Sequence, residues 1–117
     1  MIENIDPVVA KWFACWERGD TDDLPISDDF EHTSPFGTIK TKLRYLEIVN
    51  KNKKDFLGNS LKVTKQIKQE GDVCVQFEQK NKNTGLEMTV CEWYEIEDNK
   101  IKRIRSFYNI GNAEIKG

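Results

Sequence analysis

The sequence predicts an α+β domain in which helices cover the concave face of a strongly curved, mostly antiparallel sheet. Apolar residues recur with the period of a helix near residues 5–16 and again near 41–58. From residue 60 onward they alternate with polar residues, which is typical of strands with one buried face. The connections between these later segments are short, so consecutive strands are expected to pair antiparallel. A sheet of this kind can curl into a cone.

Size and composition indicate one domain spanning residues 1–117, because a chain of this length buries one core. Charged residues make up 32% and hydrophobic residues 38%, which favours a soluble globular protein. A formal net charge of −2 gives no basic surface for nucleic acid. Neither a membrane-spanning run nor a signal peptide is visible. We therefore expect a cytoplasmic protein without nucleic-acid or membrane partners.

The first predicted helix has Asp6 as its cap, Pro7 in its first turn and Gly19 as its left-handed stop. One face carries residues at helical spacing, namely Ile5, Val8, Val9, Trp12, Phe13 and Trp16. The segment DTDDLP, residues 20–25, leaves room for a short helical turn.

A short strand is predicted over residues 30–34, before a turn at residues 35–37. Strand alternation puts Phe30, His32 and Ser34 on one face, and Phe30 marks that face as buried. The imidazole of His32, the only histidine, should therefore point inward.

A second helix is predicted over residues 41–58, ending at Gly58. Its apolar side is expected to contain Leu43, Tyr45, Leu46, Ile48 and Val49. Four strands follow, at residues 61–67, 72–79, 86–96 and 100–110. Because Ile101 and Ile104 break strict alternation, a bulge there would decide whether Arg103 or Ile104 faces inward.

Aromatic residues are concentrated on the segments that should surround the concave face. We expect a ligand pocket there, lined by Trp12, Trp16, Phe30, Ser34, Phe36, Tyr45, Met88, Val90, Tyr94 and Tyr108. The other interpretation is that these rings fill the core. Buried tyrosine hydroxyls need partners, so a small, mostly apolar ligand with one or two polar groups would fit such a lining.

His32 and Glu92 are the candidate catalytic residues. Glu92 shares a strand face with Val90 and Tyr94, so its carboxyl must find a hydrogen-bonding partner or hold its proton. If the two side chains meet, they form an acid/base pair. The alternatives are a structural or ligand-orienting histidine, and a carboxylate held by that histidine, an indole or an arginine. A single histidine and three widely spaced cysteines predict neither a metal site nor a cofactor.

The opposite face of the same strands is predicted to carry an apolar patch with a polar rim. It contains Cys74, Gln76, Thr89, Cys91, Trp93, Arg103, Arg105 and Phe107. Exposed aromatic side chains rimmed by arginine are typical of an interface, so we expect a homodimer through this outer sheet face.

Several stretches in this order carry a family resemblance: WERGDTDDLP, DFEHTSPFG, GLEMTVCEWYEI and NKIKRIRSFYN. Together they resemble the nuclear transport factor 2-like superfamily, and within it the SnoaL-like polyketide cyclase and ketosteroid isomerase branch. The resemblance covers nearly the whole chain and implies a cystatin-like cone that commonly dimerises through its sheet. It leaves the reaction open, because the superfamily contains isomerases, dehydratases, epoxide hydrolases, cyclases and noncatalytic binding modules.

Matching positions argue against steroid isomerisation. The carboxylate base of the isomerases falls at Ser34, their oxyanion-donating tyrosine at Trp12 and their partner acid at Glu92. The resemblance, with the residues, favours a protein that binds a small ligand, with His32 and Glu92 transferring protons in an isomerase, lyase or cyclase reaction. The alternative is a noncatalytic ligand-binding or dimeric assembly module.

Overall fold

The computed structural model describes residues 4–109, apart from the side chains of residues 55 and 56. Its helices are α1 (Pro7–Arg18), α2 (Lys42–Lys51) and α3 (Lys53–Phe56), with a 3-10 turn at Thr21–Asp23. Its strands are β1 (Ile26–Ser34), β2 (Gly37–Lys40), β3 (Asn59–Gln69), β4 (Asp72–Asn81), β5 (Glu87–Glu97) and β6 (Lys100–Phe107). None of the helices in this described part is long and apolar enough to span a bilayer.

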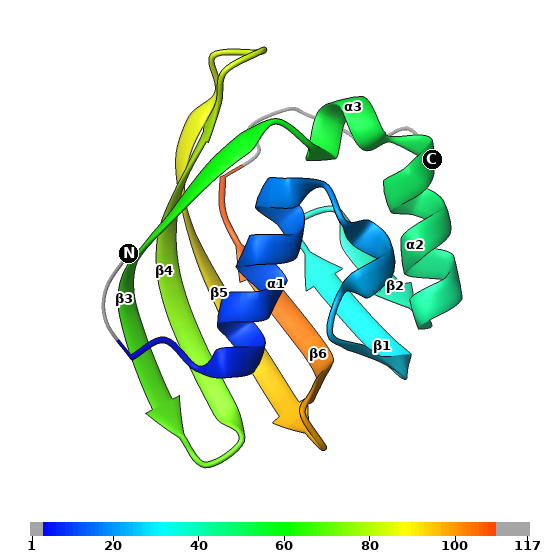
Figure 1. The fold of residues 1–117 in the computed structure, drawn as a ribbon, viewed down its shortest axis with the longest axis vertical. Helices are drawn as coiled ribbons and strands as arrows, with labels where there is room; N and C mark the ends of the chain where they lie inside the picture. Colours follow the sequence, from blue (N-terminus) through cyan, green and yellow to red (C-terminus); the bar gives the residue numbers. More distant parts are fainter. Residues whose placement is uncertain (1–3, 110–117) are drawn as a thin grey trace.

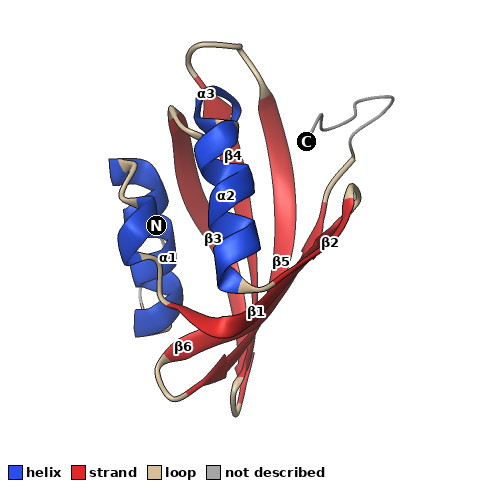
Figure 2. Ribbon diagram, turned by 90° about the vertical axis from the view of Figure 1, so that its right-hand side faces the viewer, coloured by secondary structure: helices blue, strands red, loops and turns tan. Residues whose placement is uncertain are grey.

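The strands form one curved sheet in the order β2-β1-β6-β5-β4-β3. Every neighbouring pair is antiparallel except β1 with β6, which is parallel. The helices lie on the concave side of this sheet, as Figures 1 and 2 show from two directions. The predicted α+β class is confirmed.

Helix α1 begins and ends where the sequence predicts. The Oδ1 atom of Asp6 accepts hydrogen bonds from the backbone N–H groups of Val8 and Val9, at 2.9 and 3.3 Å. Pro7 occupies the first turn, where its missing N–H costs no hydrogen bond. Gly19 ends the helix with φ 73°, a conformation that glycine adopts without strain.

The region between Pro35 and Gly58 differs from the prediction. Residues 37–40 form β2, which pairs with β1 and places Ile39 opposite His32. The predicted second helix is divided at Asn52, whose side chain donates to the carbonyl of Ile48 at 2.8 Å. Leu43 was expected on the buried side, but it is 78% exposed because α2 turns the side of Tyr45 and Val49 toward the core.

A bulge near the start of β6 fixes which side chains face inward. Glu95 pairs with Arg103 while Ile96 pairs with Ile101, so Lys102 is the extra residue. Ile104 is fully buried, whereas Arg103 bonds with Glu95 on the outer face, at 2.9 Å. By strand alternation from Ile104, the side chain of Ser106 then points toward the concave side of the sheet.

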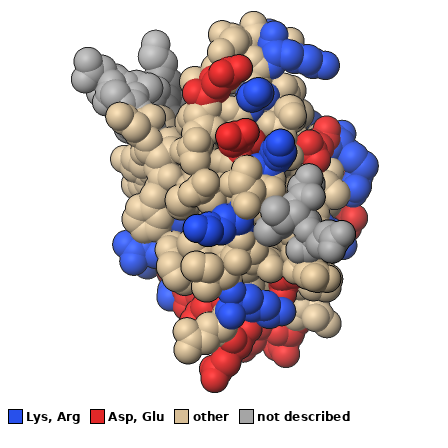
Figure 3. Space-filling model, turned by 90° about the vertical axis from the view of Figure 1, so that its left-hand side faces the viewer, with Lys and Arg blue, Asp and Glu red and all other residues tan. Residues whose placement is uncertain are grey.

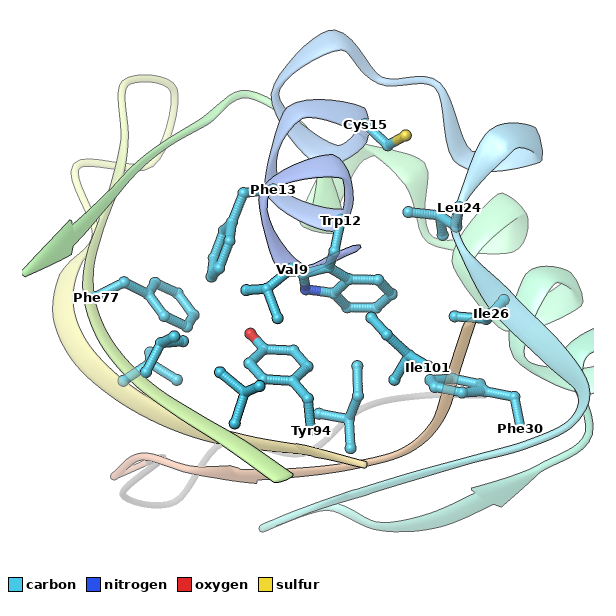
Figure 4. Packing of buried hydrophobic residues seen from close by; sticks show 14 of the residues in the cluster. Val9, Trp12, Phe13, Cys15, Leu24, Ile26, Phe30, Phe77, Tyr94 and Ile101 are labelled. Carbon is cyan, nitrogen blue, oxygen red and sulfur yellow. The ribbon is translucent and has the colours of Figure 1, made fainter. Parts of the chain in front are cut away.

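The core lies between α1 and the concave face. Figure 4 shows the ring of Phe13 directed toward Phe77, and their centroids are 4.9 Å apart in an edge-to-face arrangement. Trp12 lies over Tyr94 with centroids 6.5 Å apart. Each large side chain buried in this way contributes roughly 1.5–3 kcal/mol. The core thus holds α1 firmly over β5, which carries the candidate acid.

Candidate functional site

Glu92 places a carboxyl group inside the molecule, where its residue is only 7% exposed. Ser106, its cross-strand neighbour on β6, donates to Oε2 at 2.5 Å, and the Tyr94 hydroxyl donates to Oε1. The indole N–H of Trp12, on α1, provides a third hydrogen bond. Three elements therefore direct donors at one carboxyl group.

Two opposing effects act on the pKa of Glu92. Burial raises it, because the charged form loses water, and the hydrogen bonds from Ser106, Tyr94 and Trp12 lower it. Burial is the larger effect, so the pKa lies above that of an ordinary glutamate. Among the described residues, the groups that stabilise the carboxylate are all uncharged.

His32, on β1, is partly exposed and lies beside Ser106. Its Nε2 atom is 3.4 Å from the hydroxyl oxygen of Ser106. Burial lowers the pKa of the imidazole from 6.5 to about 4. His32 is consequently neutral at pH 7, with one ring nitrogen that donates and one that accepts.

Ser106 connects the two predicted catalytic residues. It was not among the site residues predicted from the sequence. It is 4% exposed, and its hydroxyl reaches both His32 and Glu92. Once the bulge at Lys102 turns Ile104 inward, strand alternation directs Ser106, two residues later, inward as well. We refer to Trp12, His32, Glu92, Tyr94 and Ser106 as the carboxylate cluster.

Other predicted site residues surround this cluster. Around Trp12, the rings of Phe30 and Tyr45 lie at centroid distances of 6.3 and 6.4 Å, and both are buried. Trp16 is 5.6 Å from Trp12 and half-buried. These rings are among those that the sequence predicted to line a pocket.

A second, more exposed set lies near the β1–β2 turn. The side chain of Ser34 hydrogen-bonds with the hydroxyl of Tyr108, and the ring of Phe36 is 6.3 Å from that of Tyr108. Val90 and Met88 lie on the inward side of β5, with Val90 buried and Met88 half-buried.

Two surface clefts lie away from the carboxylate cluster. One of about 510 Å³ is lined by residues such as Glu17, Asn59 and Lys80, and another of about 230 Å³ lies beside Gly71 and Lys102. Neither includes a residue of the cluster, so the aromatic pocket stays a prediction. Within residues 4–109, no three His, Cys, Asp or Glu side chains are placed together to hold a metal ion.

The outer sheet face carries the predicted apolar side chains. Trp93 is 47% exposed and Phe107 is 51% exposed, and the guanidinium of Arg105 lies 5.9 Å from the Phe107 ring centroid. Cys74 on β4 is paired with Trp93, Cys91 on β5 is paired with Phe107, and both cysteines are half-buried. Figure 3 shows a different feature of the surface: acidic side chains gather near the β3–β4 and β5–β6 turns, while lysine and arginine side chains are spread singly over that view.

Comparison with known proteins identifies the kind of domain. The family model of the SnoaL-like domain matches residues 9–104. No curated protein matches the sequence significantly.

Solved structures with the same fold span most of the chain. An NTF2-like protein of unknown function from Cytophaga hutchinsonii is 17% identical, with a TM-score of 0.75 and coverage of 93% of this chain and 95% of its own. An LEH-like epoxide hydrolase from M. tuberculosis is 17% identical, with a TM-score of 0.75 and coverage of 88% and 80%. A Catenulispora acidiphila protein with a ketosteroid isomerase-like fold, in complex with trimethylamine, is 13% identical, with a TM-score of 0.77 and coverage of 92% and 88%. At these identities the likeness establishes the fold alone.

Proposed function

The chain belongs to the SnoaL-like domain family, and from that premise we propose that it binds a small, uncharged, mostly apolar molecule beside the carboxylate cluster and transfers a proton on it with His32 and Glu92. The observation that carries this proposal is the buried carboxyl of Glu92, held by neutral donors and connected through Ser106 to a partly exposed imidazole. The reaction would be that of an isomerase, lyase or cyclase, in which a proton is removed beside a carbonyl or a hydroxyl group is eliminated.

The neutral partners of Glu92 favour a proton-transfer role over a purely structural one. A buried carboxylate whose only purpose is structural is usually paired with a cation, which holds it permanently ionised. Hydroxyl and indole donors leave both protonation states accessible, and the raised pKa makes the carboxylate a stronger base than a free glutamate. His32, neutral at pH 7, can both accept and donate a proton.

The same surroundings support an uncharged ligand. Within the described residues, the groups that shift the pKa of Glu92 include no lysine or arginine, so a ligand carboxylate would find no counter-ion there. It would also be repelled by ionised Glu92. The half-buried rings of Trp16, Phe36 and Tyr108 favour a ligand with an apolar skeleton.

Known proteins with this fold support the proposed small size of the ligand. One of these structures is an LEH-like epoxide hydrolase, and the Catenulispora protein is in complex with trimethylamine. Neither that activity nor trimethylamine is assigned to this chain. Trimethylamine is a small molecule without a carboxylate, in keeping with the size that we propose for the ligand of this chain.

A paired ligand screen tests this proposal. Purified protein is mixed with planar ketones and terpenoid alcohols and with the matching carboxylic acids, and the melting temperature and NMR spectra are recorded. We expect neutral compounds to raise the melting temperature and to shift resonances of His32 and Tyr108, while their acids do neither. For the compound that binds, deuterium exchange at its acidic C–H should be accelerated by the wild type.

Variants then separate binding from chemistry. Glu92→Gln should bind the ligand within about threefold and lose the exchange activity by 100-fold or more, and His32→Ala should lose activity by at least tenfold. Glu87→Gln, an exposed glutamate on the same strand, is the matched control. If no neutral compound binds, or if Glu92→Gln retains full exchange activity, the proposed function is wrong.

We also propose that two copies associate through the outer sheet face, because Trp93 and Phe107 expose about half of their surface beside Arg105. This is the assembly role that would remain if the carboxylate cluster proved to be only structural. Sedimentation velocity should show a dimer whose dissociation constant rises at least tenfold in Trp93→Thr. Leu43→Thr, on α2 and 78% exposed, is the control and should remain dimeric. A wild-type monomer at 100 μM would contradict this proposal.

A further inference from the structure

We propose that Ser106 is a positioning residue that relays protons between Glu92 and His32, so that the protonation state of Glu92 sets the tautomer of the imidazole. The hydroxyl of Ser106 lies 2.5 Å from Oε2 of Glu92 and 3.4 Å from Nε2 of His32. It is the atom through which the two predicted catalytic side chains are connected.

The positions of the donors determine where a proton on Glu92 can reside. Oε1 accepts the hydrogen bond from Tyr94, so this oxygen is already facing a donor hydrogen. A proton on the carboxyl group therefore belongs on Oε2, where it faces the oxygen of Ser106. In that state the carboxyl donates to Ser106, and the single hydrogen of Ser106 turns to Nε2 of His32. His32 then carries its hydrogen on Nδ1.

Ionisation of Glu92 reverses the direction of both hydrogen bonds. The proton of Oε2 moves to the oxygen of Ser106, the hydrogen of Ser106 moves to Nε2 of His32, and the hydrogen on Nδ1 leaves to solvent or to a bound molecule. The atoms balance: Glu92 has lost one proton, Ser106 has exchanged one hydrogen for another, and His32 remains neutral in its Nε2–H form. Ser106 now donates to the carboxylate and accepts from Nε2–H.

Among the described groups around Glu92, only its own carboxyl changes protonation above the pKa of His32 and below the pKa values of the tyrosines. The titratable groups that face Glu92 are Tyr94 on β5, Tyr45 on α2, Tyr108 after β6 and His32 on β1. Burial raises the pKa of each tyrosine above its usual value, so all three remain neutral hydroxyls. His32 gains a second proton only near pH 4, below the titration of Glu92.

Transfer from Glu92 to His32 moves the proton from a buried side chain to a partly exposed one. Glu92 is buried, whereas His32 is partly exposed next to Ile39 at the edge of β2. A base that is sealed from water needs a route by which its proton reaches solvent or the ligand, and His32 is the end of that route. As a catalytic route the relay rests on the proposed function, but the coupling between Glu92 and His32 exists without any ligand.

The test is NMR of the ligand-free protein from pH 5 to 9. Long-range ¹H–¹⁵N spectra report which ring nitrogen of His32 carries the hydrogen, and the ¹³C resonance of the Glu92 side-chain carboxyl reports its ionisation. We expect the imidazole to change from the Nδ1–H to the Nε2–H tautomer with the same midpoint as Glu92. In Ser106→Ala the tautomer should no longer follow Glu92, and Ser106→Thr, which keeps the hydroxyl, should restore the coupling. Glu92→Gln, which cannot ionise, should make the tautomer independent of pH.

Ser60→Ala, an exposed serine on β3, is the control and should keep the wild-type behaviour. A single His32 tautomer throughout the titration of Glu92 in the wild type would overturn the relay, as would unchanged coupling in Ser106→Ala. If Ser106→Ala does not fold, the pH dependence in the wild type and in Glu92→Gln still decides the matter. Failure of the ligand screen with intact tautomer coupling would remove the proposed function only, and ligand turnover with no coupling would remove the relay only.

Discussion

The imidazole of His32 on β1 lies against the phenol ring of Tyr45 on α2, with centroids 5.3 Å apart and planes inclined by 31°. This contact places an apolar ring over a group that would otherwise be hydrated. It contributes to the burial that lowers the pKa of the imidazole, because the charged form loses hydration there. The pair thus connects the position of a helix to the charge state of the candidate site.

The first prediction concerns stability in acid. The pKa of His32 is about 4 in the folded state and 6.5 when unfolded, so its contribution is complete above pH 6.5 and is lost as the pH falls toward 4. The loss should be on the order of 3 kcal/mol in the free energy of unfolding. Urea denaturation at a series of pH values measures it. His32→Gln should show a smaller decrease over the same range, and parallel curves for the two proteins would contradict the prediction.

The second prediction concerns the indole of Trp12. Trp12→Phe removes the N–H donor, so the pKa of Glu92 should rise further, and the smaller ring should lower the free energy of unfolding by about 1–3 kcal/mol. A ¹³C titration of the Glu92 carboxyl measures the pKa. Phe30 is also in the core but has no polar side-chain atom. Phe30→Leu should therefore destabilise the protein without removing a hydrogen bond that lowers the pKa of Glu92. An unchanged pKa in Trp12→Phe would show that the indole does not stabilise the carboxylate.

The third prediction concerns the start of α1. Burial raises the pKa of Asp6, but the hydrogen bonds from Lys68 and from the N–H groups of Val9 and Val8 outweigh it, and the pKa is lowered. Asp6→Ala should therefore cost about 1–2 kcal/mol at pH 7. Because the folded pKa is depressed, this difference should shrink as the pH falls below about 4. Asp22→Ala, at an exposed position, is the control for chemical denaturation, and an equal loss in both variants would refute the capping role.

The fourth prediction concerns Asn81, a buried amide at the end of β4. Its Oδ1 accepts from the N–H groups of Asn83 and Thr84, at 2.9 and 3.0 Å, while its Nδ2 donates to the carbonyl of Leu57 and to Asn59. Asn81→Ala leaves these groups without that partner and should cost about 2–3 kcal/mol. Thermal denaturation beside the exposed control Lys82→Ala measures the loss. Equal melting temperatures for the two variants would contradict it.

Local patterns predicted the parts of the fold that depend on nearby residues. The cap at Asp6, the stop at Gly19 and the inward position of Glu92 all follow from the spacing of neighbours along the chain. The presence of β2 did not, because residues 37–40 form a strand only by pairing with β1. Leu43 was assigned to the buried side because it is apolar, but the rotation of α2 is set by its packing on β1.

In the candidate site, the inward direction of the two catalytic candidates was predictable from the sequence, but the residue that connects them was not. Two strand alternations correctly directed His32 and Glu92 toward the same interior. Ser106 was missed because its direction depends on the bulge at Lys102, and that bulge is set by how β5 and β6 pair. The parallel pairing of β1 with β6, which brings His32 to Ser106, joins segments 74 residues apart in the sequence and has no local signal.

Strand β6, the last in chain order among the described residues, occupies a place inside the sheet, between β1 and β5. Without β6, the β1–β2 hairpin has no strand partner in the rest of the sheet, whereas β3, β4 and β5 pair with one another directly. His32 and Glu92 are therefore brought together by the same strand that joins the two parts of the sheet. A chain truncated before β6 would retain both catalytic candidates, His32 and Glu92, but would lack the strand that brings them together.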